Sequence, residues 1–190
     1  MLSSITPLGQ RGRGMSWART VAGFWVGAML AGAAVFGLAG ALGTLLGLGR
    51  LDPWLSLAVV ALAAVLDVAR VRPPGPRRQV DEDWLGRYRD WVIGLGFGAQ
   101  LGVGLVTIIP SWGTWAVLAL AAASGLPLAL FLGAAFGLGR SLLLLSARRV
   151  GSPTALATMM QRFNGAEPSA RWVALAGYGV VLLTVGIYVA

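Results

Sequence analysis

The chain has 190 residues, a mean hydropathy of +0.76 and only 12% charged residues, which excludes an ordinary soluble globular domain. Cysteine and histidine are absent, which excludes a disulfide framework, a thiol relay, a Cys/His metal site and histidine acid–base catalysis. The net charge of +8 rests on arginine alone, and we attribute it to cytoplasmic loops and anionic lipid headgroups, not to nucleic-acid binding. We expect a membrane protein that is not an enzyme and holds no cofactor or metal.

Five apolar blocks follow a polar stretch of 16 residues that does not resemble a cleavable signal. Each block is long and apolar enough to predict a membrane-spanning helix. The predicted fold is therefore an all-α polytopic membrane protein, with a single transmembrane domain over residues 1–190. The predicted spans are 21–48, 54–69, 91–124, 128–147 and 172–190.

The third block, 91–124, is too long for one ordinary span and contains Pro110 near its middle. As a continuous helix it would be about 50 Å long, against about 30 Å for the hydrocarbon core of a bilayer. It is therefore either a hairpin of two spans or one span broken at Pro110. Trp112 and Trp115 favour a hairpin, because tryptophan prefers the membrane interface and a hairpin tip would lie there.

The distribution of arginine favours one broken crossing. With five crossings, thirteen of the fifteen arginines lie on the cytoplasmic side, mainly in loops 70–90 and 148–171, whereas a hairpin reduces the split to nine against five. We therefore predict a protein of the bacterial inner membrane with a cytoplasmic N-terminus and an extracytoplasmic C-terminus.

Both cytoplasmic loops show local order. Pro73, Pro74 and Pro76 predict an extended basic linker, because proline excludes helix there. Ser152-Pro153 and Asn164-Gly165 are helix start and stop signals. Between these signals, apolar residues at helical spacing predict an amphipathic helix on the membrane surface: Leu156, Met159, Met160 and Phe163.

An internal repeat links the two halves of the chain. The residues Gly32–Leu38 (GAAVFGL) recur as Gly133–Leu138 (GAAFGL), and Ile5–Gly9 loosely matches Ile109–Gly113 at a similar offset. The repeated unit would be a proline-broken helix followed by two ordinary helices. Three crossings per unit make the two units inverted, as in many secondary transporters. The first unit is incomplete, since its broken helix is represented only by Leu2–Gly9.

With these motifs the chain resembles the CcdA/DsbD transmembrane family of the lysine-exporter-like superfamily. The resemblance rests on Ser4–Leu8, on Gly94–Gly102 leading to Pro110, and on Phe136–Arg140. It implies six spans with both termini outside and broken first and fourth helices. Loss of the first half-helix would leave five spans and an inside N-terminus. In electron-carrying members a cysteine follows each of the two prolines; here Leu8 and Ser111 stand in those positions, so the resemblance implies a member without thiol–disulfide exchange.

Arg140 is the outstanding polar residue, because it lies near the middle of the predicted span 128–147, where an unpaired charge costs at least ~2.5 kcal/mol. It is either part of an anion site, paired with Asp67, or bound to carbonyls freed near Pro110. Asp67 also lies three residues before Arg70 and can pair locally. Four further polar positions of 91–124 would share one face of a continuous helix: Gln100, Thr107, Ser111 and Thr114. Their hydroxyls serve either to satisfy the broken backbone or to line a polar cavity with Arg140.

Small residues four apart predict close helix packing and not a nucleotide-binding loop. They occur in the first span at Gly23, Gly27 and Ala31, and in the third at Gly94, Gly98 and Gly102.

Two functions fit these features. The leading prediction is a transporter of a small solute or ion that uses the broken helix and Arg140. The alternative is a non-catalytic membrane subunit that docks or helps to assemble another membrane or extracytoplasmic redox complex. The expected partners are the lipid bilayer and either a second copy of the chain or another membrane protein.

Overall fold

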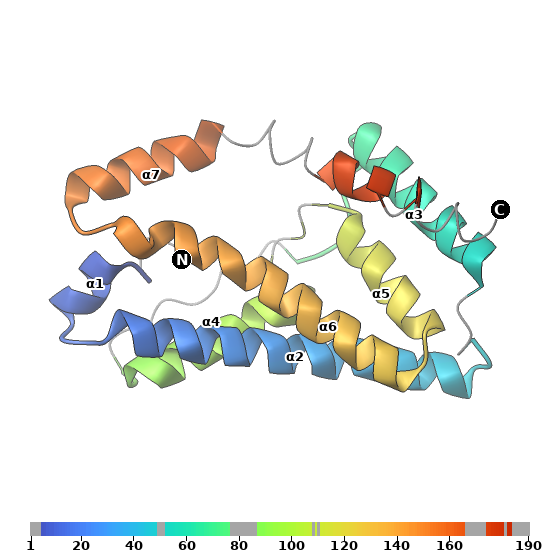
Figure 1. Ribbon diagram of the computed structural model, residues 1–190, viewed down its shortest axis with the longest axis horizontal. Coiled ribbons are helices and arrows are strands. Elements are labelled where there is room, and N and C mark those ends of the chain that lie inside the picture. The colour runs from blue at the N-terminus through green and yellow to red at the C-terminus, as the bar shows by residue number, and fades with distance from the viewer. Residues whose placement is uncertain are drawn as a thin grey trace.

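Glycine-rich apolar sequences form long helices that approach one another closely, and this feature organises the fold. The computed structural model describes residues 5–48, 52–76, 87–107, 109, 111–165, 174–180 and 182–183, among which there are helices and loops and no strand. Predictions about Pro110, Leu2–Ser4, linker 77–86 and most of 166–190 lie outside these residues. Figure 1 shows the arrangement of the helices, whose bounds are α1 Pro7–Gly12, α2 Trp17–Leu45, α3 Pro53–Val68, α4 Asp90–Val103, α5 Gly113–Ala123, α6 Leu126–Ser141, the 3₁₀ helix η2 Leu142–Arg149 and α7 Pro153–Gly165.

Helix α2 is the centre of the fold, with α4 parallel to it and α6 antiparallel. Gly94, Gly98 and Gly102 of α4 face the backbone of α2 at Thr20, Phe24 and Ala28 in the same order. Gly133 and Gly137 of α6 face Gly32 and Ala28 in the reverse order. The predicted small-residue faces are thus the faces by which these helices meet, because glycine lets two backbones approach.

The carbonyl oxygen of Ala28 marks the point where the three helices cross. A Cβ added at Gly102 or at Gly137 would overlap this same oxygen, and Ala28 itself is fully buried. Larger side chains fill the space on either side of the crossing. One cluster joins Phe24, Ile93, Phe97 and Leu144, and a second joins Phe36 to Ala121 and Ala129.

The segment 91–124 advances along α2 and does not turn back. Its first part, α4, begins beside Thr20 in the first turn of α2, and its last part, α5, ends with Ala122 against Gly43 in the last turns of α2. Helix α4 ends at Val103 and α5 begins at Gly113. The apolar segment 91–124 thus forms two helices, and Pro110, where the break is predicted, lies outside the described residues.

Helix α3 and the linker that follows it pack against the start of α5. Trp112 and Trp115 hold the linker through their indole nitrogens. Trp112 Nε1 donates to the carbonyl of Val71 at 2.9 Å and Trp115 Nε1 donates to that of Pro74 at 3.1 Å. Residues 71–76 of the linker are not helical, as the prolines predict.

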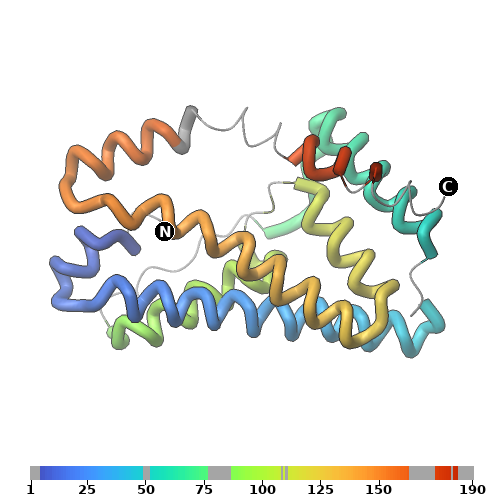
Figure 2. The backbone as a smooth tube through the Cα atoms, viewed as in Figure 1, coloured from blue at the N-terminus to red at the C-terminus, as the bar shows by residue number. Residues whose placement is uncertain are grey.

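The amphipathic helix is present as α7, but its apolar face packs on the protein. Met159 is buried in a cluster with Ala147 and Val150, and Leu156 and Met160 flank it. Helix α1 lies at the same end of the molecule, where the amide of Leu8 donates to the carbonyl of Val150 at 3.2 Å. The chain trace places α1 and α7 at one end and α3 with α5 toward the other (Figure 2).

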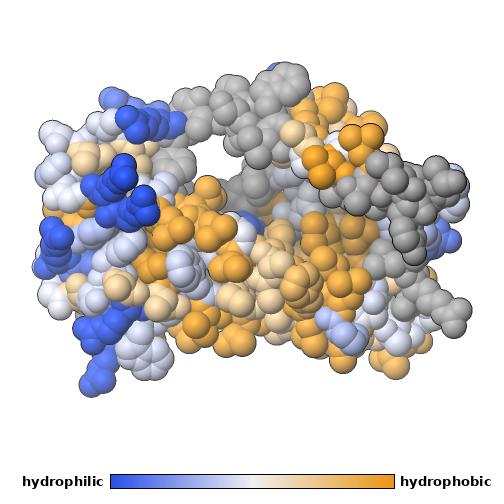
Figure 3. Space-filling model, viewed as in Figure 1, coloured by the Kyte–Doolittle hydropathy of each residue, from blue (hydrophilic) through white to orange (hydrophobic). Residues whose placement is uncertain are grey.

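Charged and apolar surfaces separate along the long axis. Hydrophilic side chains gather at the end that carries α1 and α7, and apolar side chains cover much of the surface along α2 and α6 (Figure 3). By length and composition, two described helical segments are sufficient to cross a membrane: Trp17–Leu45 with 29 residues and Leu126–Arg149 with 24. Pro53–Val68 and Gly113–Ala123 are apolar but shorter, so the structure supports an all-helical fold and does not establish five crossings.

Candidate functional site: polar groups around the helix break

Helix α4 ends at a glycine that shapes the site. Gly104 follows the last helical residue with a left-handed φ of 72°, a conformation that glycine adopts without steric cost. A Cβ at this position would lie 2.8 Å from the ring of Phe136 and 3.3 Å from Nη1 of Arg140. The break thus brings the backbone of α4 against the side chains of α6.

Arg140 extends from the last turn of α6 toward the interrupted segment. Its Nη1 donates to the carbonyl of Gly104 at 3.5 Å and its Nη2 to Oγ1 of Thr107 at 3.4 Å. The guanidinium carbon lies 5.5 Å from the centre of the Phe136 ring, within range of a cation–π contact. The two hydrogen bonds are longer than the usual 2.7–3.2 Å and are therefore weak. The contact with the Phe136 ring consequently supplies part of the interaction that holds the guanidinium in place.

A second polar group joins α3, the start of α5 and the helical residues 174–180. One carboxylate oxygen of Asp67 accepts hydrogen bonds from Ser111 Oγ and from the hydroxyl of Tyr178, each at 2.6 Å. The other accepts the backbone amide of Trp112 at 2.9 Å. Ser111 Oγ also accepts the amide of Gly113 at 2.9 Å, so side chains satisfy the amides that begin α5.

The predicted site residues therefore divide between separate places. Arg140 and Thr107 are brought together, and Asp67 and Ser111 belong to the other group; the described residues contain no ion pair between Asp67 and Arg140. Gln100 lies in α4 and the buried Thr114 lies in α5. The four polar positions do not share one helical face, because α4 ends at Val103 and α5 begins ten residues later.

Tyr178 is a member of this group that the sequence analysis did not single out. It is one of two tyrosines within the predicted span 172–190, and a buried tyrosine hydroxyl usually has a hydrogen-bond partner. That rule would have marked Tyr178, but not the distant Asp67 as its partner.

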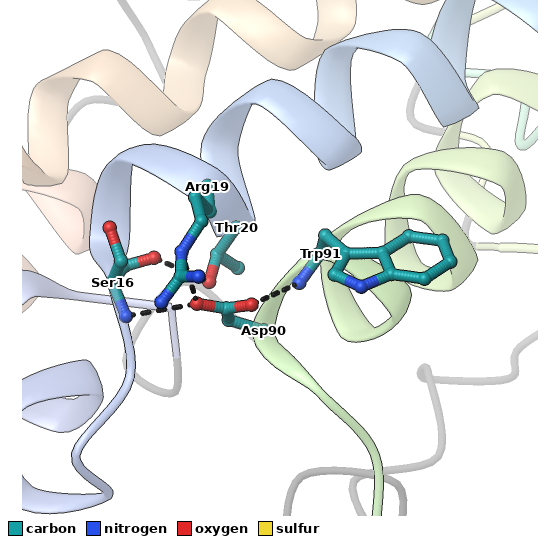
Figure 4. A network of polar contacts seen from close by, with 5 residues as sticks. All are labelled: Ser16, Arg19, Thr20, Asp90 and Trp91. Carbon is teal, nitrogen blue, oxygen red and sulfur yellow. Dashed lines mark hydrogen bonds and ion pairs between the residues drawn. The ribbon is translucent and has the colours of Figure 1, made fainter.

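A third group ties the starts of α2 and α4 together, as Figure 4 shows. One oxygen of Asp90 accepts the amide of Ser16 at 3.1 Å and lies 2.9 Å from Nε of Arg19. The other accepts the amide of Trp91 at 2.9 Å. A single carboxylate therefore caps the first turns of two parallel helices, where the helix dipoles also favour negative charge.

We expect the stability of the protein to depend on the charge of Asp90. Burial alone would raise the pKa of Asp90, but the amides of Ser16 and Trp91 and the charge of Arg19 outweigh it and hold the pKa below its ordinary value of 3.8. A lowered native pKa means that the stabilisation is complete above pH 3.8 and is lost as the pH falls through the native pKa. Asp90→Asn should therefore lower the thermal midpoint at neutral pH, with a difference from the unmodified protein that shrinks below pH 3.8. A difference that stays constant into acid would contradict this role.

The side chains of these three polar groups hold the backbone in position at helix ends. Among the described residues, no three His, Cys, Asp or Glu side chains come together in a way that would hold a metal ion. Carboxylates and a hydroxyl accept the backbone amides of Trp112, Gly113 and Ser16 at helix starts, and the guanidinium of Arg140 donates to the carbonyl of Gly104 at the end of α4.

Over the described residues the chain is thus all-helical, with two helices long and apolar enough to cross a membrane and with polar groups at helix ends. It is similar to the methylamine utilization protein MauF of Paracoccus versutus, with 36% identity over 155 residues, which is 74% of this chain and 54% of that protein. The chain therefore spans about half the length of this curated relative. No family model matches the chain, and no solved structure matches it.

Proposed function

We propose that the protein is a membrane-embedded, non-catalytic accessory protein that serves methylamine utilization by docking on or helping to assemble a partner complex. The similarity to MauF, 36% identity over 155 residues, carries this proposal. It favours the accessory role over the transporter role that the broken helix first suggested.

The fold supports an accessory role in two ways. The three central helices meet backbone to backbone at Ala28, Gly102 and Gly137, which makes a rigid frame with little room for a pathway between them. The polar groups that are present engage the protein's own backbone. With neither cysteine nor histidine in the sequence, the redox chemistry of such a system would belong to the partner.

For the scaffold, we propose a CcdA/DsbD-like plan with an inverted repeat and five crossings. Helices α2 and α6, which carry the repeated sequence, pack antiparallel through Gly32 and Gly133, as an inverted repeat requires. Helix α5 lies at the C-terminal end of α2, and α1 correspondingly lies at the end of α6 that continues into η2. The run of 91–124 from one end of α2 to the other supports a single broken crossing.

Cysteine labelling tests the orientation directly, because the chain has no cysteine of its own. With the N-terminus inside, Ser152→Cys should resist an impermeant maleimide in intact cells and react after permeabilisation. Trp54→Cys, at the exposed start of α3, should react from outside in intact cells. Reaction of Ser152→Cys from outside would overturn the proposed topology.

Deletion of the gene tests the accessory function. The deletion strain should lose growth on methylamine as the sole nitrogen source and retain growth on ammonium, and a plasmid-borne copy should restore growth. Purification from native membranes of methylamine-grown cells should then yield a stoichiometric partner. Unimpaired growth on methylamine would reject the proposal.

Transport remains the second candidate, favoured by the position of Arg140 against the unwound residues 104–107. In that case Arg140→Gln should abolish uptake by proteoliposomes while the thermal midpoint changes little.

If Arg140 instead serves to hold the break, Arg140→Gln should destabilise the protein. The expected loss is about 1–2 kcal/mol of unfolding free energy, since the contacts to Gly104, Thr107 and Phe136 would go. Arg11→Gln, at an exposed position of α1, serves as the matched control for the same chemical change without loss of these contacts. Thermal unfolding in detergent distinguishes this outcome from the transport outcome.

A further inference from the structure

An open groove of about 200 Å³ lies between α3 and α5, and its lining is almost wholly apolar. Leu62 and Leu66 of α3 line one side, and Ala116 and Ala119 of α5 line the other. On each helix the lining residues recur at the spacing of one helical face. The two helices are joined at the Asp67 end by hydrogen bonds to Ser111 and Trp112, and beyond that end small alanines on α5 leave the groove open.

Two tryptophans form the end of the groove near the linker. The rings of Trp112 and Trp115 line it, while their indole nitrogens donate to the carbonyls of Val71 and Pro74. The indoles thus line the groove and direct their polar edges to the linker.

Two exposed arginines stand beside this end. Arg70 and Arg72 flank Val71, whose carbonyl is held by Trp112. Arg70 adopts a left-handed φ of 57° at the C-terminal end of α3, where glycine is the residue with no steric cost. The oxygens of the nearby Asp67 accept hydrogen bonds from Ser111, Tyr178 and Trp112. A positive charge therefore adjoins an apolar groove, the complement of a phosphate headgroup with an acyl chain.

We propose that this groove binds one anionic phospholipid, with an acyl chain between α3 and α5 and the headgroup at Arg70 and Arg72. Water gains little in an apolar groove of this kind, whereas a hydrocarbon chain fills it and makes dispersion contacts with both helices. The proposal goes beyond the accessory function and does not depend on it.

Native mass spectrometry of the detergent-purified protein, with added phosphatidylglycerol or phosphatidylcholine, tests the proposal. The unmodified protein should retain one phosphatidylglycerol with about five-fold or greater preference over phosphatidylcholine, since each arginine near an anionic headgroup contributes roughly that factor. Arg70→Gln with Arg72→Gln should remove the preference, and the matched pair Arg148→Gln with Arg149→Gln, exposed at the end of η2, should keep it. Equal binding of the two lipids by the unmodified protein would overturn the proposal.

A substitution that fills the groove distinguishes a lipid bound in the groove from a lipid attracted by the arginine charges alone. Ala119→Phe should abolish the bound lipid, because the new ring occupies the groove from an exposed position. Ala34→Phe, at an exposed position of α2, is the matched control and should bind lipid normally. Circular dichroism and thermal unfolding should match for the two variants. The proposal would be overturned if Ala119→Phe retained the lipid. It would also be overturned if this variant lost a co-purifying protein and not a lipid.

Discussion

Gly137→Ala is expected to destabilise the protein, while Gly139→Ala, two residues further along the same helix, is expected to stabilise it. A Cβ at position 137 would overlap the carbonyl oxygen of Ala28, a backbone atom that is itself packed against α4. At position 139 nothing lies within 4 Å of the added atom. The first change should cost about 2–3 kcal/mol, as overpacking does, and the second should gain up to about 1 kcal/mol from helix propensity.

Thermal unfolding of the purified variants in detergent measures this difference. For a chain of this size the cost at position 137 corresponds to a fall of roughly 4–12 °C in the midpoint. Both substitutions add the same atom to the same helix, so helix propensity and mean hydropathy change equally. If the two midpoints moved in the same direction by similar amounts, the close crossing at Ala28 would be wrong.

Asp67→Leu is expected to release α3 and the helical residues 174–180 from the start of α5. The substitution removes the acceptor for Ser111, for Tyr178 and for the amide of Trp112. Hydrogen bonds to a charged group contribute about 1.5–3 kcal/mol each, and the loss should be about 3 kcal/mol or more because partly buried donors are left without an acceptor.

Hydrogen–deuterium exchange is the suitable measurement, because it reports local opening. Exchange should accelerate at Trp112 and along α3, while the α2–α4–α6 crossing remains protected. Tyr178→Phe should show a smaller effect of about 1 kcal/mol confined to 174–180. Asp52→Leu, at the other end of α3, should cost about 1 kcal/mol as the loss of a helix cap and leave Trp112 unaffected. Identical exchange in the Asp67 and Asp52 variants would contradict the connecting role of Asp67.

The helical fold and its packing faces could be predicted because they depend on local patterns. Glycines four apart marked the surfaces through which α2 and α4 meet. Helix bounds were close as well, with α3 at 53–68 against a predicted 54–69. These features follow from periodicity and hydropathy, which a single sequence displays directly.

The polar groups were harder to predict because their members are far apart in the chain. Asp67 is 44 residues from Ser111 and 111 residues from Tyr178, and no local pattern links them. The prediction of one polar face over Gln100–Thr114 required a continuous helix, but Gly104 turns the chain into the left-handed region and ends it. Gly104 is one of several glycines in this segment, and the sequence alone does not indicate which of them ends the helix.

The cap that Asp90 provides has a consequence for synthesis. Asp90 lies 74 residues after Ser16, so at about 5–20 residues per second the start of α2 leaves the ribosome roughly 4–15 s before the residue that caps it. During this interval both glycine faces of α2 lack their partners, because α4 and α6 do not yet exist. The first long helix of the nascent chain therefore acquires its packing partners from helices made later, and until then it needs protection from contact with unrelated helices. Substitutions that weaken the α2–α4 contact should consequently lower the yield of inserted protein more than they lower the stability of the molecules that do fold.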